Sequence, residues 1–291
     1  MIEVFHVSDL HFGQSVSRNR RAGHLLDAIS RQFPFEGRDN RFLLVTGDIT
    51  QNGRKSEYEL ALQALAPFAG RVFLTPGNHD YGSLLGTDYS VRKARYFDSP
   101  FAETLGFTHP FFNKKVFTRQ LLDPSDHSAL LVIGLNSCAR EGIFDFAQGE
   151  VGAAQLAELD SIIAGADPKT PTLVFLHHIP DKEAEWDFVM TLRDWKELVT
   201  VVSGRVDVLA FGHQGTLMEV GRRGKAGAVP VQTRPMRARS LAPAVKRGGA
   251  RDGKRALVLD ADGSVPEQAL YRITLDGGKP TVSVIAVAET G

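Results

Sequence analysis

Cysteine is nearly absent from this sequence, because the 291-residue chain has only one, Cys138. A disulfide within the chain is therefore excluded, and the cysteine count predicts a reducing, cytoplasmic environment. No apolar stretch is long enough to cross a membrane as a helix. We also expect no secretion signal, because the first residues lead directly into a polar motif. The formal net charge is zero, so the overall charge indicates no class of partner.

The charges are nevertheless unevenly distributed. Residues 221–291 contain 13 basic and 6 acidic residues, against 21 basic and 28 acidic residues in 1–220. We expect 1–220 to form the main domain, and 221–291 to form a basic loop followed by β-strands packed on it. No aromatic residue interleaves with the charges of 222–255, which favours a solvated or partner-docking loop over a nucleic-acid site. Self-association through this carboxyl-terminal region stays open.

Five short apolar runs each end in residues that metal ions favour. They are 2–8 before Asp9 and His11, 42–46 before Gly47-Asp48, 72–76 before Gly77-Asn78-His79-Asp80, 173–176 before His177-His178, and 206–211 before Gly212-His213. Continuous apolar runs of this length predict strands that are buried on both faces. Helix-like stretches at 56–68, 149–164 and 195–202 lie between them, so the pattern predicts a mainly parallel α/β sheet. Because ligands bind at the carboxyl ends of such strands, the five clusters should converge.

Two regions depart from this pattern. Residues 81–128 form a long connection that is rich in phenylalanine, and its rings are expected either to fill a small satellite core or to contact a substrate. Residues 255–261, 268–275 and 281–287 alternate like antiparallel strands separated by Asp-Gly turns.

The residue types at the strand ends predict a metal centre. Asp9 and His11 are two positions apart, and in extended backbone their side chains would project to the same side. The two oxygens of Asp48 can bridge two cations, and Asn78, His177 and His213 can complete a second site. Mixed Asp, Asn and His ligation suits Mn²⁺, Fe or Zn²⁺.

A centre of this kind is suited to phosphoryl chemistry. Two metal ions can activate a water molecule and neutralise the charge of a phosphoryl group. His79 is the candidate to protonate the leaving oxygen or to bind a phosphate oxygen. Asp80 would either orient His79 or cap a turn.

In order and spacing, these blocks resemble the signature of the calcineurin-like metallophosphoesterases. The resemblance spans residues 1 to about 220, and residues 47–53 and 149–159 are most similar to the branch that includes the bacterial class III cyclic-nucleotide phosphodiesterases. The fold that it implies is a four-layer α/β/β/α sandwich of two stacked mixed sheets. The implied roles are first-metal ligands at Asp9 and His11, a bridging ligand at Asp48, second-metal ligands at Asn78, His177 and His213, and a phosphate-binding, leaving-group histidine at His79.

The chain departs from the family pattern at one position. The family's last block reads Gly-His-x-His, whereas this chain reads Gly212-His213-Gln214-Gly215. Gly215 therefore replaces a first-metal ligand, and the first site is expected to bind its ion weakly.

The resemblance implies a phosphodiesterase that acts on a small phosphorylated substrate, of the cyclic-nucleotide or glycerophosphodiester type. A pyrophosphate hydrolase acting on a nucleotide-linked lipid or sugar is the alternative. A second alternative is a catalytically impaired binding module, because of Gly215.

Overall fold

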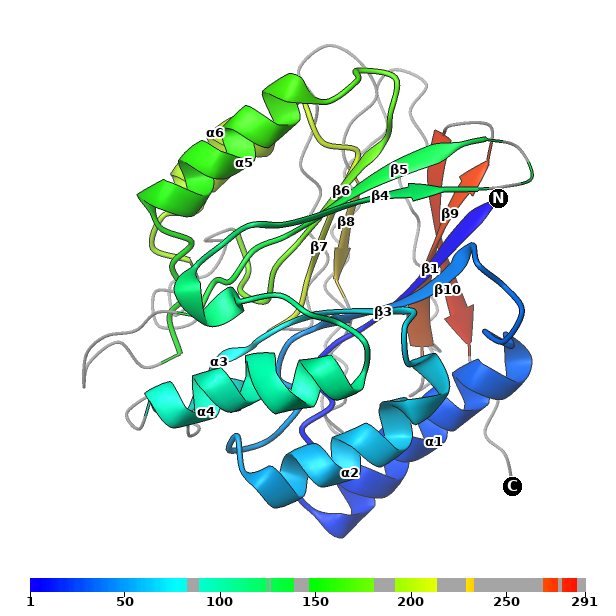
Figure 1. Cartoon of the computed structure of the whole chain (residues 1–291), viewed down its shortest axis with the longest axis vertical. Coiled ribbons are helices and arrows are strands. Elements are labelled where there is room, and N and C mark those ends of the chain that lie inside the picture. The colour runs from blue at the N-terminus through cyan, green and yellow to red at the C-terminus, as the bar shows by residue number, and fades with distance from the viewer. Residues whose placement is uncertain are drawn as a thin grey trace, which may run out of the picture.

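Two sheets of five strands each form the centre of the fold, and helices lie on their outer sides (Figure 1). The computed structural model describes residues 1–82, 89–123, 125, 127–138, 147–180, 192–213, 229–232, 269–276 and 279–286. Gln214, Gly215 and most of the basic stretch 222–255 lie outside these ranges, as does the strand expected at 255–261. None of the helices in the described ranges is long and apolar enough to cross a bilayer.

The first sheet has the order β10-β9-β1-β2-β3. β1, β2 and β3 are parallel, β9 runs antiparallel to β1, and β10 runs antiparallel to β9. These strands are β1 Ile2–Val7, β2 Arg41–Thr46, β3 Val72–Thr75, β9 Ala269–Asp276 and β10 Lys279–Ala286. The antiparallel strands β9 and β10 coincide with two of the strands that the alternating pattern of the carboxyl-terminal region predicts. The proposed division of the chain at residue 220 stays a prediction. Strand β9, which follows that position, pairs directly with β1, which precedes it.

The second sheet has the order β4-β5-β6-β7-β8, in which only β4 is antiparallel to its neighbour. Its strands are β4 Phe117–Leu122, β5 Ala129–Gly134, β6 Thr172–Phe175, β7 Val208–Phe211 and β8 Val229–Gln232. β8 corrects the expectation of a continuous loop over 221–255. A strand can form there because residues 229–232 contain no charged side chain and pair in parallel with β7.

Helices cover the outer face of each sheet. They are α1 Val16–Gln32, α2 Lys55–Leu65, η1 Ala66–Phe68, α3 Asn78–Tyr81, α4 Val91–Tyr96, η2 Phe97–Ala102, η3 Phe111–Asn113, α5 Ala153–Gly165 and α6 Trp195–Val202. Along β6, Leu173 and Phe175 belong to the core that the two sheets share, whereas Val174 belongs to the core beneath α5 and α6. This alternation confirms the α/β/β/α sandwich.

Helix α1 was not predicted from the sequence. Its buried side chains Ala22, Leu25, Leu26 and Ile29 follow helical spacing, and the Ser15 hydroxyl caps its start by accepting from the Arg18 amide at 3.1 Å. The arginines at its amino end obscure that apolar stripe.

The phenylalanine-rich connection packs into the main core. Phe101 lies 4.6 Å from Tyr58 and Phe117 lies 5.7 Å from Phe73, measured between ring centroids. The expectation of a separate satellite core was therefore wrong, because these rings continue the core of the first sheet.

Candidate metal centre

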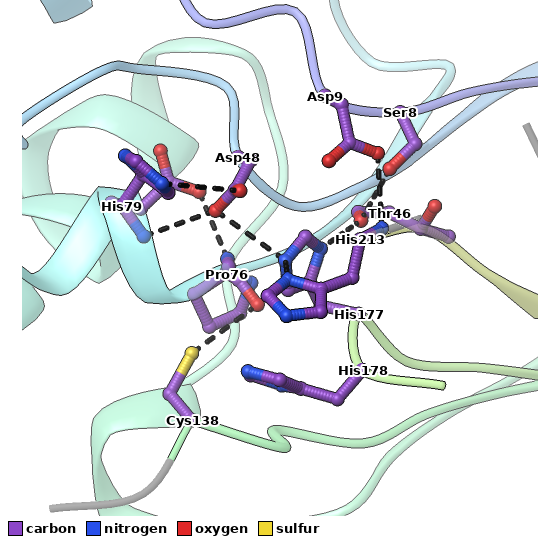
Figure 2. Close-up of polar contacts among 12 residues, drawn as sticks. Ser8, Asp9, Thr46, Asp48, Pro76, His79, Cys138, His177, His178 and His213 are labelled. Carbon is purple, nitrogen blue, oxygen red and sulfur yellow. Dashed lines mark hydrogen bonds and ion pairs between the residues drawn. The ribbon is translucent and has the colours of Figure 1, made fainter. Parts of the chain in front are cut away.

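Polar residues from the ends of both sheets meet at one buried location (Figure 2). Asp9 and His11 follow β1, Asp48 follows β2, and His79 lies in α3 after β3. His177 follows β6 and His213 follows β7, so the second sheet contributes as well. All six side chains are buried. The structure thus brings together the strand ends that the sequence pattern predicted to converge.

The atoms that could bind a metal ion lie within a few ångströms of one another. The Nε2 atom of His11 is 3.7 Å from Asp48 Oδ2 and 3.9 Å from Asp9 Oδ1. On the other side, His177 Nε2 is 3.4 Å from Asp48 Oδ1 and 2.9 Å from His213 Nδ1. Asp48 therefore lies between two groups of donors, as a bridging carboxylate would.

Four of these residues hold a left-handed backbone conformation. The φ angles are 56° for Asp9, 50° for His11, 50° for Asp48 and 74° for His213. Residues other than glycine seldom adopt positive φ, and such strain concentrates at functional sites. The expectation that extended backbone aims Asp9 and His11 to one side was wrong. Instead, the chain coils after β1 and brings both side chains inward.

Glycines leave the space that the neighbouring side chains occupy. A Cβ atom on Gly77 would lie 2.2 Å from Asp48 Oδ1, and one on Gly212 would lie 2.9 Å from Asp9 Oδ2. Real Cβ atoms do not approach other atoms this closely. The glycines of the two motifs are thus required for the close approach of adjacent strand ends.

Backbone carbonyl groups orient two of the histidines. His177 Nδ1 is 2.8 Å from the Thr46 carbonyl oxygen, and His79 Nδ1 is 2.8 Å from the Gln51 carbonyl oxygen. Each Nδ1 must therefore carry the proton and donate it, which leaves the Nε2 lone pair available. Thr46 and Gln51 were not identified from the sequence, because a backbone carbonyl leaves no signal in residue type.

Of the two roles expected for Asp80, the structure shows the capping of a turn and not the orientation of His79. Its carboxylate accepts hydrogen bonds from the amides of Ile49, Thr50 and Gly77 and from the Thr50 hydroxyl, at 2.8–3.2 Å. The ring of His79 is held by Gln51 instead. Burial and the nearby Asp48 raise the pKa of Asp80 to about 6. Asp80 therefore joins the loops after β2 and β3.

Asn78 has the environment expected of a ligand without its ion. Both atoms of its side-chain amide are buried, and neither has a hydrogen-bond partner within the described ranges. Buried polar atoms are rarely left in this state. The adjacent amide of His79 donates to Asp48 Oδ1 at 3.0 Å, so Asn78 begins its helix beside the Asp48 carboxylate. A cation next to Asp48 would supply the missing partner of the Asn78 oxygen.

Burial disfavours the charged form of every titratable group at the centre. Contacts between carboxylates and imidazoles determine which of these groups stay charged. Burial opposes ionisation of Asp48, but His177 and His79 outweigh it and hold the pKa of Asp48 well below its usual value. Burial also opposes protonation of His177, yet Asp48 and then Asp9 raise its pKa to about 9. Burial lowers the pKa of His11 to about 3. The carboxylates thus favour positive charge at this location, and a metal ion would satisfy the same attraction.

The structure also brings His178 to the centre, although the resemblance gave it no role among the implied ligands. One nitrogen each of His177, His178 and His213 lie within 4.8 Å of one another. Its position beside His177 in the chain is the available signal, but neighbouring residues on a regular strand face opposite ways, which argues for only one of the two. β6 ends at Phe175, so that alternation does not apply to residues 177 and 178.

Comparison with known proteins places this arrangement among phosphoesterases. The sequence model of one family, described as calcineurin-like phosphoesterase, matches residues 2–216. A probable cyclic nucleotide phosphodiesterase from Ruthia magnifica subsp. Calyptogena magnifica is 23% identical over 188 residues, which are 64% of this chain and 67% of that protein.

Solved structures share the fold at low identity. A dimetal phosphatase from Danio rerio has a TM-score of 0.60 and 14% identity, with 99% of both chains covered. A purple acid phosphatase from yellow lupin seeds has a TM-score of 0.56 and 12% identity, covering 94% of this chain and 49% of that chain. An anchor protein of the inner membrane complex of Plasmodium has a TM-score of 0.54 and 11% identity, covering 98% and 84%. These likenesses show the shared architecture.

Proposed function

The chain belongs to the calcineurin-like phosphoesterase family, and on this premise we propose that it is a phosphodiesterase for a small phosphodiester of the cyclic-nucleotide or glycerophosphodiester type. Family membership makes it a phosphoric ester hydrolase and implies divalent metal ions. The finer proposal concerns the substrate class, the metal ligands and the residues that act on the substrate.

The position of Asp48 between two donor groups carries the proposal. His11 Nε2 lies 3.7 Å from one oxygen of its carboxylate, Oδ2, and His177 Nε2 lies 3.4 Å from the other, Oδ1. We assign Asp9, His11 and Asp48 to a first ion, and Asp48, Asn78, His177 and His213 to a second. The unpartnered amide of Asn78 supports this assignment.

The donor set fits Mn²⁺, Fe or Zn²⁺, because imidazole is a borderline ligand and carboxylate and amide oxygens are hard ligands. Two such ions would supply a nucleophile from water at neutral pH and neutralise charge on the phosphoryl group. Gly215 has no side chain to offer the first ion, so we propose that the first site is the weaker of the two.

The protein's own groups would position the substrate and handle the leaving group. The hydrogen bond from His79 Nδ1 to Gln51 leaves Nε2 as the atom that can exchange a proton with substrate. This Nε2 is 4.0 Å from Asp48 Oδ2, so the ring lies next to the proposed reacting centre. We assign His79 to binding of a phosphoryl oxygen and protonation of the leaving oxygen.

The choice of a diester over other phosphate compounds is supported by sequence. The relative from Ruthia magnifica is a probable cyclic nucleotide phosphodiesterase, and residues 47–53 are similar to the same branch. A cytoplasmic location and self-association through the carboxyl-terminal region stay predictions.

Hydrolysis of bis(p-nitrophenyl) phosphate tests the proposal. We expect turnover that rises with added Mn²⁺ and falls about 10³-fold in Asp48→Asn, equivalent to about 4 kcal/mol of transition-state stabilisation. Asp27→Asn, an exposed carboxylate on α1, is the matched control and should leave turnover unchanged. Equal turnover in the Asp48→Asn and Asp27→Asn proteins would contradict the assignment of Asp48.

A substrate panel then separates the classes. Cyclic nucleotides, glycerophosphodiesters, phosphomonoesters and nucleotide-linked pyrophosphates should be compared by kcat/KM with the same metal. We expect the diesters to be hydrolysed best. A preference for the pyrophosphates would replace the proposal with a pyrophosphate hydrolase, and no turnover of any compound would favour an impaired binding module.

A further inference from the structure

We propose that Arg18 is a positioning residue for the first metal site, because its guanidinium holds the turn that carries Asp9 and His11. The inference rests on the proposed function, which assigns these two residues to the first ion. Arg18 belongs to none of the motifs at the strand ends, and arginine on a helix is most often a surface charge. Its place in the folded chain gives it the role.

Arg18 is buried, which is unusual for its residue type. It is 4% exposed, and no other lysine or arginine in the described ranges is buried. A guanidinium that leaves water needs hydrogen-bond acceptors within the protein, because the loss of solvation is costly. One acceptor is the Asp9 carbonyl oxygen, 3.0 Å from Nη2. Both groups are buried, so bulk water does not replace this bond.

The bond acts on a strained part of the backbone. Asp9 and His11 both have positive φ, at 56° and 50°. Residues other than glycine keep such angles only where their surroundings fix the backbone. Three amides of this turn donate to backbone carbonyls of the loop after β2. The pairs are Asp9 with Gly47, His11 with Asp48 and Phe12 with Ile49, at 2.9–3.1 Å.

Arg18 fixes the turn from another direction. The three amide bonds connect the turn to the loop after β2, whereas the carbonyl group of Asp9 bonds to a side chain of α1. The ψ angle of Asp9 sets the direction of this carbonyl, and it also sets the path of the chain toward His11. A bond that holds the carbonyl therefore holds both ligands in their relative positions.

Helix α1 keeps Arg18 in place. The Arg18 amide donates to the Ser15 hydroxyl at 3.1 Å, and Ala22, one turn further on, is fully buried. The segment before the helix is bonded to it as well, since the Gly13 amide donates to Asn19 Oδ1 at 2.7 Å. The guanidinium thus acts from an element that core packing and its own cap hold against the sheet.

The first ion depends on this turn more than the second ion does. Two of the three groups assigned to the first ion, Asp9 and His11, lie in the turn, and Gly215 has no side chain to add. The ligands assigned only to the second ion follow other strands, and they are Asn78, His177 and His213. Loss of the Arg18 bond should therefore weaken the first ion and affect the second much less.

Metal binding by the chelator-stripped full chain tests the inference. Equilibrium dialysis against rising Mn²⁺ measures the affinity for each ion. Arg18→Met removes the donors and keeps an apolar stem. It should weaken one ion about 10–100-fold, the loss typical when a group that orients a ligand is removed, and change the other much less. Arg20→Met, at an exposed position on the same helix, is the matched control and should leave both affinities unchanged.

Hydrogen exchange of the metal-free chain shows whether Arg18 acts through the turn. The amides of Asp9, His11 and Phe12 should exchange faster in Arg18→Met, whereas those of α5, which covers the other sheet, should keep their rates. Faster exchange throughout the chain, together with equal weakening of both ions, would make Arg18 an ordinary structural residue and overturn the inference.

Two further results would also overturn it. One is a folded Arg18→Met protein that binds every ion as tightly as the unmodified chain. The other is unchanged exchange of the three turn amides. Arg18→Gln gives the same comparison if Arg18→Met does not fold, because its amide suits a buried polar position but ends two bonds short of Nη2.

Hydrolysis assays on the same samples keep the two proposals separate. An unmodified chain that binds two ions, one of them dependent on Arg18, but hydrolyses no phosphodiester would contradict the proposed function alone. An unmodified chain that hydrolyses bis(p-nitrophenyl) phosphate, with Mn²⁺ affinities that Arg18→Met does not change, would contradict only the role of Arg18.

Discussion

His79 is the residue whose proposed role depends most on the substrate. If it protonates the leaving oxygen, its removal should matter most when that oxygen leaves as an alkoxide. We expect His79→Asn to slow hydrolysis of a glycerophosphodiester about 10²–10⁴-fold. Hydrolysis of bis(p-nitrophenyl) phosphate should be slowed much less by the same substitution, because its leaving group needs no proton. Measuring kcat for both substrates checks this, and an equal loss for both would reduce His79 to a phosphate-binding group.

Asp98 gives the stability of the chain a pH dependence that is independent of the centre. Its Oδ2 accepts from the Phe112 amide at 2.8 Å, its Oδ1 has no partner in the described chain, and burial raises its pKa from 3.8 to about 7. Because the folded chain binds this proton more tightly than the unfolded chain, the carboxyl favours folding most below pH 4. That contribution is lost as the pH rises through 7.

Asp98→Asn should remove this dependence, because the amide cannot ionise. Between pH 5 and pH 8 the unmodified chain should lose on the order of 2 kcal/mol more stability than the variant, with the partial exposure of the group taken into account. Denaturant unfolding at the two pH values measures the difference. Asp27→Asn serves as an exposed control, and parallel pH profiles for all three proteins would refute the assignment to Asp98.

The residues of the centre could be predicted from the sequence, because Asp, Asn and His are the residue types that bind metal ions. The contacts that these residues make could not be predicted. Asp9, Asp48 and His213 stand out in the sequence as metal-binding types after apolar runs. The backbone coil that aims Asp9 and the carbonyl of Gln51 that holds His79 leave no trace in residue type. His178 was missed for a related reason, since the direction of a side chain beyond a strand end depends on φ and ψ values that the sequence pattern does not fix.

At the scale of elements, the loops after β2 and β3 approach each other as closely as a glycine allows. A Cβ atom on Gly77 would lie 2.2 Å from Asp48 Oδ1 and 2.4 Å from the Asp48 amide nitrogen. Gly77→Ala should therefore displace the Asp48 carboxylate, which we propose to be a metal ligand, and lower metal affinity by about 10–100-fold or more, the loss typical of a disturbed ligand shell. Metal competition and thermal melting together measure it.

Gly23 provides the matched control on α1. A Cβ atom there meets nothing within 4 Å, so Gly23→Ala should stabilise the chain by about 0.5–1 kcal/mol through helix propensity. Unchanged metal affinity in Gly77→Ala would show that the two loops can separate without loss of the centre.

The elements that sequence reasoning found are those with one dominant apolar pattern. α6 was predicted at its observed bounds, and the strands that lead into the centre were found because burial on both faces makes them continuously apolar. α1 was missed because its polar face includes Arg20 and Arg21 near its start. β8 was missed because four residues within a basic stretch give too short a pattern, and only pairing with β7 makes them a strand.

At the scale of the whole molecule, the proposed centre joins the two sheets. Asp9 and Asp48 follow strands of the first sheet, and His177 and His213 follow strands of the second. An ion that binds only the folded chain stabilises it, by about 2.7 kcal/mol at a free concentration of 100 Kd. We expect added Zn²⁺ at that level to raise Tm by about 4–5 °C, and a chelator to reverse the gain.

Asp48→Asn separates binding at the centre from adventitious binding. The variant should lose most of the gain in Tm, because both proposed ions share this carboxylate. A gain of the same size in the variant would place the stabilising ion elsewhere on the chain.

The span of the ligands along the chain sets when the centre can form. Asp9 and His213 are 204 positions apart, yet the amide of His213 donates to the Asp9 carboxylate. A ribosome that adds about 5–20 residues per second needs about 10–40 s to make that interval. Throughout that time the nascent chain carries only part of its ligand set. Insertion of the proposed second ion would therefore be a late event, and the metal that the cell installs would be set by the ions available after most of the chain has been made.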